Sequence, residues 1–167
     1  MFVCVHLGLA FLLPTVHVLF FLKDRSPGSI GRTYLHYLLP IAIGLGGLIA
    51  FMGHAFRADE VARSIGWQPG SPFQFEVAVA NLAFAVLGIL CLRFRDGFWL
   101  ATILGYGVFL EGAAYGHVQE IVQAGNWATN NAGVVLLVDI VLPPLLLGMF
   151  VLSRRGLKPG RGRVTRP

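Results

Sequence analysis

The sequence predicts an all-α integral membrane bundle of about five transmembrane helices with short loops. Three observations support this fold class. Hydrophobic residues make up 56% of the 167 residues and charged residues only 13%. The mean hydropathy of +0.71 lies outside the usual range for a soluble domain. The apolar residues also fall into runs of about 20, the length that a hydrocarbon core about 30 Å thick requires.

Five apolar runs have this length and are expected to form one transmembrane domain over residues 1–153. They cover residues 2–22, 34–55, 73–92, 97–121 and 133–152. The first run lacks the basic start and the small-residue cleavage site of a signal peptide, so we expect it to be retained. Residues 58–67 are typical of a short amphipathic helix lying in the interface or covering an outer site. Residues 154–167 are expected to form a flexible basic tail.

Lys and Arg are strongly biased to one side of this topology. The first loop, the third loop and the tail hold eleven of the thirteen basic residues: Lys23, Arg25, Arg32, Arg93, Arg95, Arg154, Arg155, Lys158, Arg161, Arg163 and Arg166. Because cytoplasmic loops retain positive charge, we expect the N-terminus outside and the C-terminus in the cytoplasm, in the cell membrane. Attraction to anionic lipid headgroups accounts for the net charge of +5, so nucleic acid is not an expected partner.

Local signals predict how several of the helices begin and bend. Ser71 is a favourable N-cap for the third span, Pro72 suits its first helical position, and Gln74 would complete a capping box. Asn131 is the expected cap of the fifth span. Pro40 is interpreted as the site of a kink in the second span.

Small and aromatic residues suggest packing roles. The glycines of "GLGG" (44–47) and the pair Gly112 and Gly116 predict close helix contacts. Trp67 and Trp99 suit interfacial aromatic belts. Cys4 and Cys91 lie near opposite ends of their spans, so a disulfide between them is excluded by distance.

Acidic and imidazole side chains occur at membrane depth in spans two to five. We expect an outer layer formed by His54, Glu76, His117 and Glu120, and a middle layer formed by Glu111 and Asp139. Asn81 lies a turn and a half deeper than Glu76 on the third span. The predicted spans contain no Lys or Arg, so these acids must be protonated, exposed to water or bound to a cation. We therefore expect them to face the interior of the bundle.

The fifth span offers a further possible ligand group around Asp139. Pro143 and Pro144 follow at positions that remove the helix hydrogen bonds of the Asp139 and Ile140 carbonyls. Freed carbonyls in broken helices coordinate cations in several transporters. The pattern thus favours a cation or proton site near the middle of the membrane.

Two stretches resemble a family of small multi-pass membrane proteins known only as a domain of unknown function. They are "GHAFRADEVARSIGWQPGSPFQFEVAVANLAF" (53–84) and "FLEGAAYGHVQE" (109–120) with the Asn-rich loop that follows, and the resemblance covers roughly residues 40–145. It implies a membrane fold and no particular reaction. It adds Gln74 and Asn126 to the candidate site and again includes His54, Glu76, Asn81, Glu111, His117 and Glu120.

Three functions remain open at this point. The first is binding or conduction of a proton, a cation or a small solute. The second is an enzyme that acts on a hydrophobic substrate by acid–base chemistry or with a metal ion held by His54, Glu76, His117 and Glu120. A bundle-type di-metal site needs two Glu-x-x-His motifs, whereas the chain has one reversed motif, His117 to Glu120. The third is an accessory subunit of a larger membrane complex, in which the polar layers are packing or assembly contacts. Self-association into a homo-oligomer also stays open.

Overall fold

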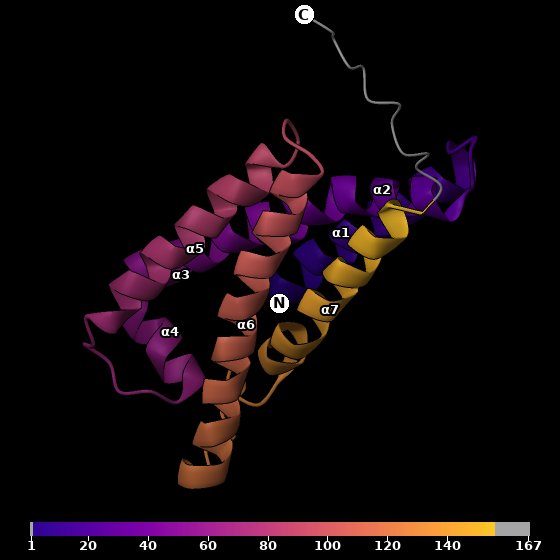
Figure 1. The fold of residues 1–167 in the computed structure, drawn as a ribbon. Helices are drawn as coiled ribbons and strands as arrows, with labels where there is room; N and C mark the ends of the chain where they lie inside the picture. The colour runs from indigo at the N-terminus through magenta and orange to yellow at the C-terminus, as the bar shows by residue number, and fades with distance from the viewer. Residues whose placement is uncertain (1, 156–167) are drawn as a thin grey trace, which may run out of the picture.

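The computed structural model describes residues 2–155, which are helical apart from their turns and loops. The elements are α1 (Phe2–Phe20), α2 (Pro27–Leu38), the π-helical segment η1 (Leu39–Leu45), α3 (Gly46–Phe56), α4 (Ala58–Ile65), α5 (Phe73–Leu90), α6 (Gly97–Ala124) and α7 (Val134–Ser153) (Figure 1). Among the described residues, five helical stretches are long and apolar enough to cross a membrane: Val3–Phe20, Pro27–Phe56, Phe73–Leu90, Gly97–Ala124 and Val134–Ser153. The predicted fold class is therefore confirmed. Residues 156–167, most of the predicted tail, lie outside the described residues.

The helix boundaries agree with the predicted spans except at the start of the second. That span begins at Pro27 rather than at residue 34. Ser26 caps it, because the Ser29 N–H donates to the Ser26 hydroxyl at 3.3 Å, and proline is well suited to a first helical turn. The Ser-Pro-Gly run therefore starts a helix.

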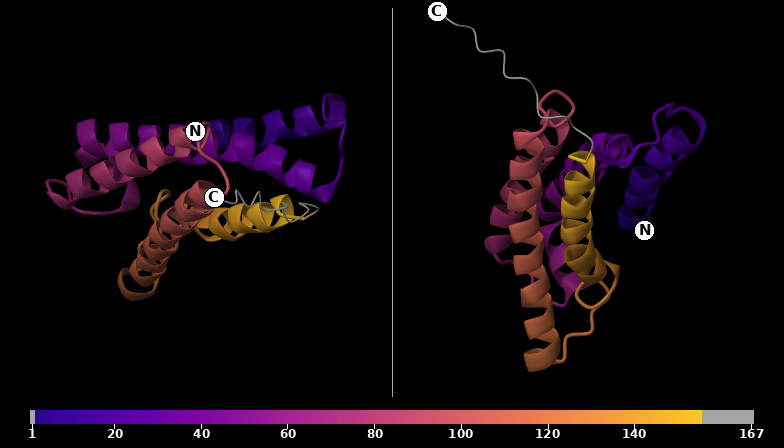
Figure 2. Two further views of the ribbon diagram at one scale, coloured as in Figure 1. Left: turned by 45° about the horizontal axis from the view of Figure 1, so that its top comes forward. Right: turned by 45° about the vertical axis from the view of Figure 1, so that its right-hand side comes forward.

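The helices form two layers. α1, α2, α3 and α5 lie side by side in one layer, and α6 and α7 cross one face of it (Figures 1 and 2). α5 packs along η1 and α3, while α7 packs against both α6 and α2. α5 and α6 are consecutive but share few contacts, because they diverge from their connecting loop (Figure 1).

Glycine allows the closest contact within the first layer. A Cβ atom added at Gly88 of α5 would lie 2.4 Å from the backbone nitrogen of Gly44 in η1, and one added at Gly47 would lie 2.8 Å from the Asn81 carbonyl oxygen. The packing predicted for "GLGG" is thus confirmed. The contact lies beside the π-helical turn, which begins next to Pro40, where the missing N–H interrupts regular α-helix bonding.

The second predicted glycine contact is wrong within this chain. Atoms added as Cβ at Gly112 and Gly116 of α6 would meet nothing within 4 Å. These glycines follow the spacing of a helix-packing motif, but no other helix of the described chain covers them.

The start of α5 differs from the predicted capping box. The helix begins at Phe73, and its N-cap position is Pro72 rather than Ser71, one residue later than the capping box required. The Ser71 hydroxyl accepts a hydrogen bond from the Phe73 N–H at 3.3 Å. The Gln74 side chain does not reach back to the cap, because it forms a hydrogen bond with His54 instead.

α7 also differs from its predicted form. It runs as an unbroken α-helix from Val134 to Ser153 and includes both Pro143 and Pro144. Its N-cap position is Gly133, whereas the expected cap, Asn131, is fully buried and bonds elsewhere. The helix is therefore not broken at these residues, although neither proline can donate a hydrogen bond to the Asp139 or Ile140 carbonyl.

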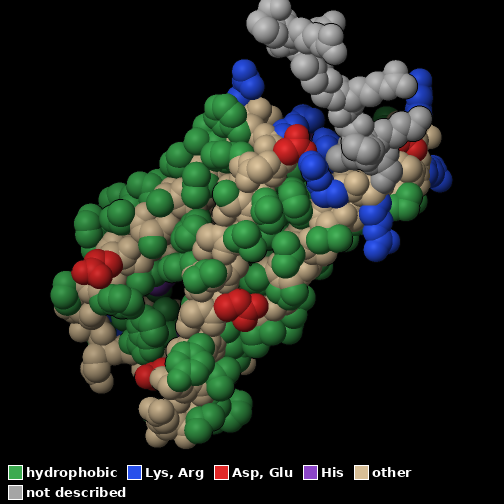
Figure 3. Space-filling model, viewed as in Figure 1, with side chains coloured by type: hydrophobic (Ala, Val, Ile, Leu, Met, Phe, Trp, Pro, Cys, Tyr) green, Lys and Arg blue, Asp and Glu red, His purple; other side chains and the backbone are tan. Residues whose placement is uncertain are grey.

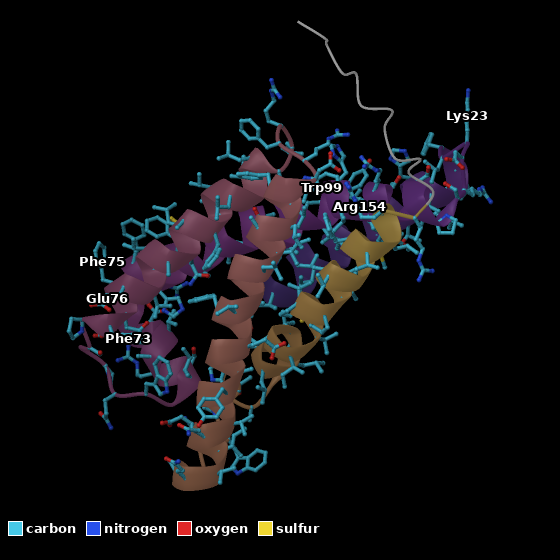
Figure 4. All side chains as sticks on the ribbon, viewed as in Figure 1. Lys23, Phe73, Phe75, Glu76, Trp99 and Arg154 are labelled. Carbon is cyan, nitrogen blue, oxygen red and sulfur yellow. The ribbon has the colours of Figure 1, made fainter. Side chains whose placement is uncertain are left out.

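The two ends of the molecule differ in charge. One end, which we call the basic end, holds the α1–α2 turn, the α5–α6 loop and the last turn of α7, with Lys23, Arg25, Arg32, Arg93, Arg95, Arg154 and Arg155 (Figures 3 and 4). The opposite end, which we call the polar end, holds α4 and the α6–α7 loop, with Arg57 and Arg63. The basic residues of the described chain are thus concentrated at one end, as the loop charges predicted. Which end faces the cytoplasm stays a prediction.

Hydrogen bonds join three segments at the basic end. Asp96, between α5 and α6, accepts from Arg32 of α2 at 3.1 Å and from Arg154 after α7 at 2.8 Å. Nearby, Trp99 Nε1–H donates to the Cys91 carbonyl at 2.9 Å. Because Trp99 is 2% exposed, it belongs to the core and not to the expected interfacial belt (Figure 4).

The close contact at Gly88 gives a direct test of the packing. We expect Gly88→Ala to lower the free energy of unfolding by about 1–3 kcal/mol, the usual range for overpacking. Gly148→Ala is the matched control, because a Cβ there would meet nothing within 4 Å. The measurement is the unfolding transition of each purified variant in detergent. Equal transitions for the two variants would contradict the α5–η1 contact.

Candidate functional site

His117 is the centre of a buried polar cluster near the polar end. It lies on α6 and is 7% exposed. Its Nδ1 is 2.7 Å from Oδ1 of Asn131 in the α6–α7 loop, and its Nε2 is 3.8 Å from Oδ2 of Asp139 on α7. The first distance is a short hydrogen bond, and the second is an ion-pair distance slightly too long for a direct hydrogen bond.

The partners of Asn131 fix the proton on one nitrogen of His117. Asn131 Nδ2 is 2.8 Å from the Asn126 carbonyl oxygen and 3.3 Å from the His117 carbonyl oxygen. Carbonyl oxygens only accept, so the amide nitrogen must face them and the amide oxygen must face His117. Since that amide oxygen also only accepts, His117 Nδ1 carries a proton. Nε2 is therefore the nitrogen that can gain or lose one, and it faces Asp139.

Asp139 is a buried acid that lies at ion-pair distance from His117. It is 5% exposed and lies in the second turn of α7. Two further titratable groups, Glu111 and Tyr106 of α6, are close enough to interact with it electrostatically. A charged carboxylate in an apolar interior needs a compensating proton or cation. His117 Nε2 is positioned to share a proton with the Asp139 carboxyl group.

Trp67 packs against the imidazole of His117. Its ring stacks on the His117 ring with centroids 6.5 Å apart and planes 21° from parallel. It follows α4, the short helix predicted for residues 58–67, which spans Ala58–Ile65. Trp67 is thus a contact of the site rather than a belt residue.

Hydrogen bonds hold α4 to the Asn-rich loop between α6 and α7. Asn126 Nδ2 donates to the Ile65 carbonyl at 2.9 Å, and Asn130 Nδ2 donates to the Ser64 hydroxyl at 3.0 Å. Gly66 has a φ of +84°, and a Cβ there would lie 2.4 Å from Asn126 Oδ1. Only glycine fits this position, for both backbone and steric reasons. α4 therefore links the two layers across the polar end.

A second polar pair lies on the other side, between α3 and α5. His54 Nδ1 is 2.6 Å from Gln74 Oε1, and Gln74 is buried. Asn81, also buried, donates to the Val77 carbonyl of its own helix at 2.9 Å. Figure 3 shows a hollow between α5 and α6 in which a histidine side chain is visible. The predicted inward orientation thus holds for His54, Gln74, Asn81, His117 and Asp139.

The three glutamates behave differently from this prediction. Glu76 is exposed on α5 and points away from the bundle beside Phe73 and Phe75 (Figure 4). Glu111 is exposed on α6. Glu120 is partly buried, and its Oε2 accepts a hydrogen bond from Asn126 at 3.3 Å. Figure 3 shows separate acidic side chains in an apolar surface, away from the basic end.

The predicted layers also need correction. Asp139 pairs with His117 of the expected outer layer, because α7 begins at Val134 and places it only in the second turn. Glu111 lies at the middle of the 28-residue α6, six residues before His117 and therefore about 9 Å further along the helix. The middle layer is reduced to Glu111, which still interacts electrostatically with Asp139.

The geometry does not assemble the expected metal ligands. Within residues 2–155, no group of three or more His, Cys, Asp or Glu side chains is arranged to hold a metal ion. His54 is paired with Gln74, His117 with Asn131 and Asp139, and Glu120 with Asn126, while Glu76 faces outward.

Removing the Asn131 side chain tests the fixed proton on His117. We expect Asn131→Ala to lower stability by about 1–3 kcal/mol, because it leaves buried polar groups unpaired. It should also mix the two neutral forms of His117, which nitrogen NMR of histidine-labelled protein detects. Asn130→Ala is the control, since Asn130 is exposed and bonds only the α4 segment. An unchanged His117 signal in Asn131→Ala would refute this assignment.

Comparison with known proteins gives a family and no activity. A family model described as a family of unknown function (DUF6790) matches residues 1–159, a wider range than the stretches that carried the resemblance. Neither a curated protein nor a solved structure matches the chain. Since the family model covers nearly the whole sequence, the protein is a member of the DUF6790 family.

Proposed function

We propose that this protein binds and exchanges a proton at the His117–Asp139 pair, and that this exchange accompanies the binding or passage of a cation or small solute. The observation that carries the proposal is the arrangement of His117. Asn131 holds the proton on Nδ1, so Nε2 is directed at a buried carboxyl 3.8 Å away. One proton satisfies both groups, either as imidazolium with carboxylate or as neutral imidazole with carboxylic acid.

The surroundings of the pair favour a proton over a permanent counterion. The titratable groups facing Asp139 are His117, Glu111 and Tyr106, all on α6. None of these is a permanent cation, so neutralising the buried acid requires a proton or a mobile cation. Loss of the shared proton would leave the pair with a net negative charge. That charge attracts either a proton or a mobile cation.

The route for exchange runs through the polar end. His117 lies two turns from the end of α6, and the ring of Trp67, which follows α4, stacks on its imidazole. Small movements of α4 would therefore open or close the path to water. In the proposed arrangement the polar end faces outward across the cell membrane, as the charge of the loops predicts.

Proton movement into sealed vesicles tests this function. Purified protein is reconstituted into liposomes that contain a pH-sensitive dye, and a pH step is applied at a clamped membrane potential. We expect Asp139→Asn and His117→Gln to reduce proton flux to the background of protein-free liposomes. Glu76→Gln is the matched control, because it removes an exposed acid outside the cluster and should leave the flux unchanged.

A second measurement follows the proton on the site itself. Infrared difference spectra between acidic and neutral pH should contain a carboxylic acid band that disappears in Asp139→Asn and shifts in His117→Gln. If the Asp139→Asn spectrum equals that of the unmodified protein and its flux is also unchanged, the pair exchanges no proton and the proposal is wrong.

A further inference from the structure

A groove lies between α6 and α7, and neither His117 nor Asp139 is among its lining residues. Its volume is about 450 Å³, and its lining includes Gly107, Val108, Glu111, Pro143, Pro144 and Leu147. Every lining residue except Glu111 is apolar. The groove is therefore an apolar surface with one carboxyl group, of a size typical for a small organic ligand.

The residues of the two helices explain why the groove exists. Gly107 has no side chain, so α6 approaches Pro143 closely, and a Cβ at Gly107 would lie 3.4 Å from Pro143 Cβ. Beside this contact the helix surfaces separate, and Val108 is 77% exposed. The groove is thus open on the side that faces lipid.

Among residues 2–155, Glu111 has no hydrogen-bond or ion-pair partner. It does interact electrostatically with Asp139, but two carboxylates repel each other and do not form a pair. It lies at the middle of α6, where a carboxylate facing acyl chains is strongly unfavourable. A lipid tail in the groove would leave this acid unpaired. A second copy related by twofold symmetry would place another Glu111 near the first, which repels when both are charged.

We propose that this groove binds a hydrophobic organic cation, such as a lipophilic amine, ammonium or phosphonium ion. The positive centre lies against Glu111, and the apolar body lies along Gly107, Val108 and Pro144. Charge complementarity selects this occupant, because it supplies the missing counterion and covers the apolar lining at the same time.

This site also identifies a solute class for the proposed proton exchange, and that part rests on the proposed function. Glu111 interacts electrostatically with Asp139, so a cation bound at Glu111 weakens the negative field at the His117–Asp139 pair. Cation binding therefore favours proton release, and protonation in turn disfavours the cation, as linkage between two sites requires.

The binding test uses tetraphenylphosphonium and protein in phosphatidylcholine nanodiscs, measured by equilibrium dialysis without a pH gradient. We expect saturable binding to the unmodified protein and at least about tenfold weaker binding to Glu111→Gln, because the carboxylate partner is lost. Glu76→Gln is the control of equal charge change and should bind normally. Val108→Trp, which fills the groove from an exposed position, should also weaken binding.

Three outcomes would overturn this inference. They are equal affinity in Glu111→Gln and the unmodified protein, equal binding of the neutral probe triphenylphosphine oxide, and cross-linking of Val108→Cys into a dimer that excludes the cation. Because dialysis needs no proton flux, failure of the groove and failure of the proposed function are distinguishable. Asp139→Asn should abolish flux while retaining phosphonium binding.

Discussion

The hydrogen bond between His117 and Asn131 is the interaction on which the polar end depends. It connects α6 to the loop that precedes α7, and the same Asn131 amide satisfies two backbone carbonyls. In an apolar medium each unpaired polar group is costly, so these bonds must form together. With the loop fixed, Asn126 can reach Ile65, and α4 is held where Trp67 covers His117.

The two ends of the bundle are held by different interactions. At the basic end, the ion pairs of Asp96 with Arg32 and Arg154 join three segments. Because solvent screens these charges, the ion pairs contribute only modest stability. At the polar end, the His117 imidazole and the Asn131 amide are buried and hydrogen-bonded to each other. Between them, backbone contact at Gly44 and Gly88 allows dense packing without polar groups. The buried cluster of His117, Asn131 and Asp139 therefore lies at one end of a largely apolar bundle.

The number and limits of the spans could be predicted because lipid imposes a length and a composition on each. The inward orientation of His54, His117 and Asp139 followed from the cost of burying charge. The orientation of Glu76 and Glu111 could not be predicted. Their helices are largely apolar around the whole circumference, so no polar stripe distinguishes the interior face from the lipid face. The sequence analysis also assigned Asn131 to a helix cap, whereas in the structure it bonds His117 and two backbone carbonyls. The density of asparagines in this loop was the signal that could have pointed to that bonding.

Trp67 was missed for a similar reason. An aromatic residue near a span end suits an interfacial belt equally well, and only the turn at Gly66 directs its ring onto His117. Gly112 and Gly116 show the opposite case, since their spacing is that of a packing motif, yet they are open within the described chain. Such positions depend on long-range contacts that local patterns do not encode.

The length of α6 has a consequence for the surrounding lipid. Its 28 residues span roughly 42 Å at 1.5 Å per residue, well beyond a hydrocarbon core of about 30 Å. The helix must therefore tilt or extend into the headgroup region, an example of hydrophobic mismatch. Thin bilayers would leave the imidazole end of α6 nearer the aqueous phase, and thick ones would draw it toward the acyl chains. Access of water to the buried histidine is consequently coupled to membrane thickness.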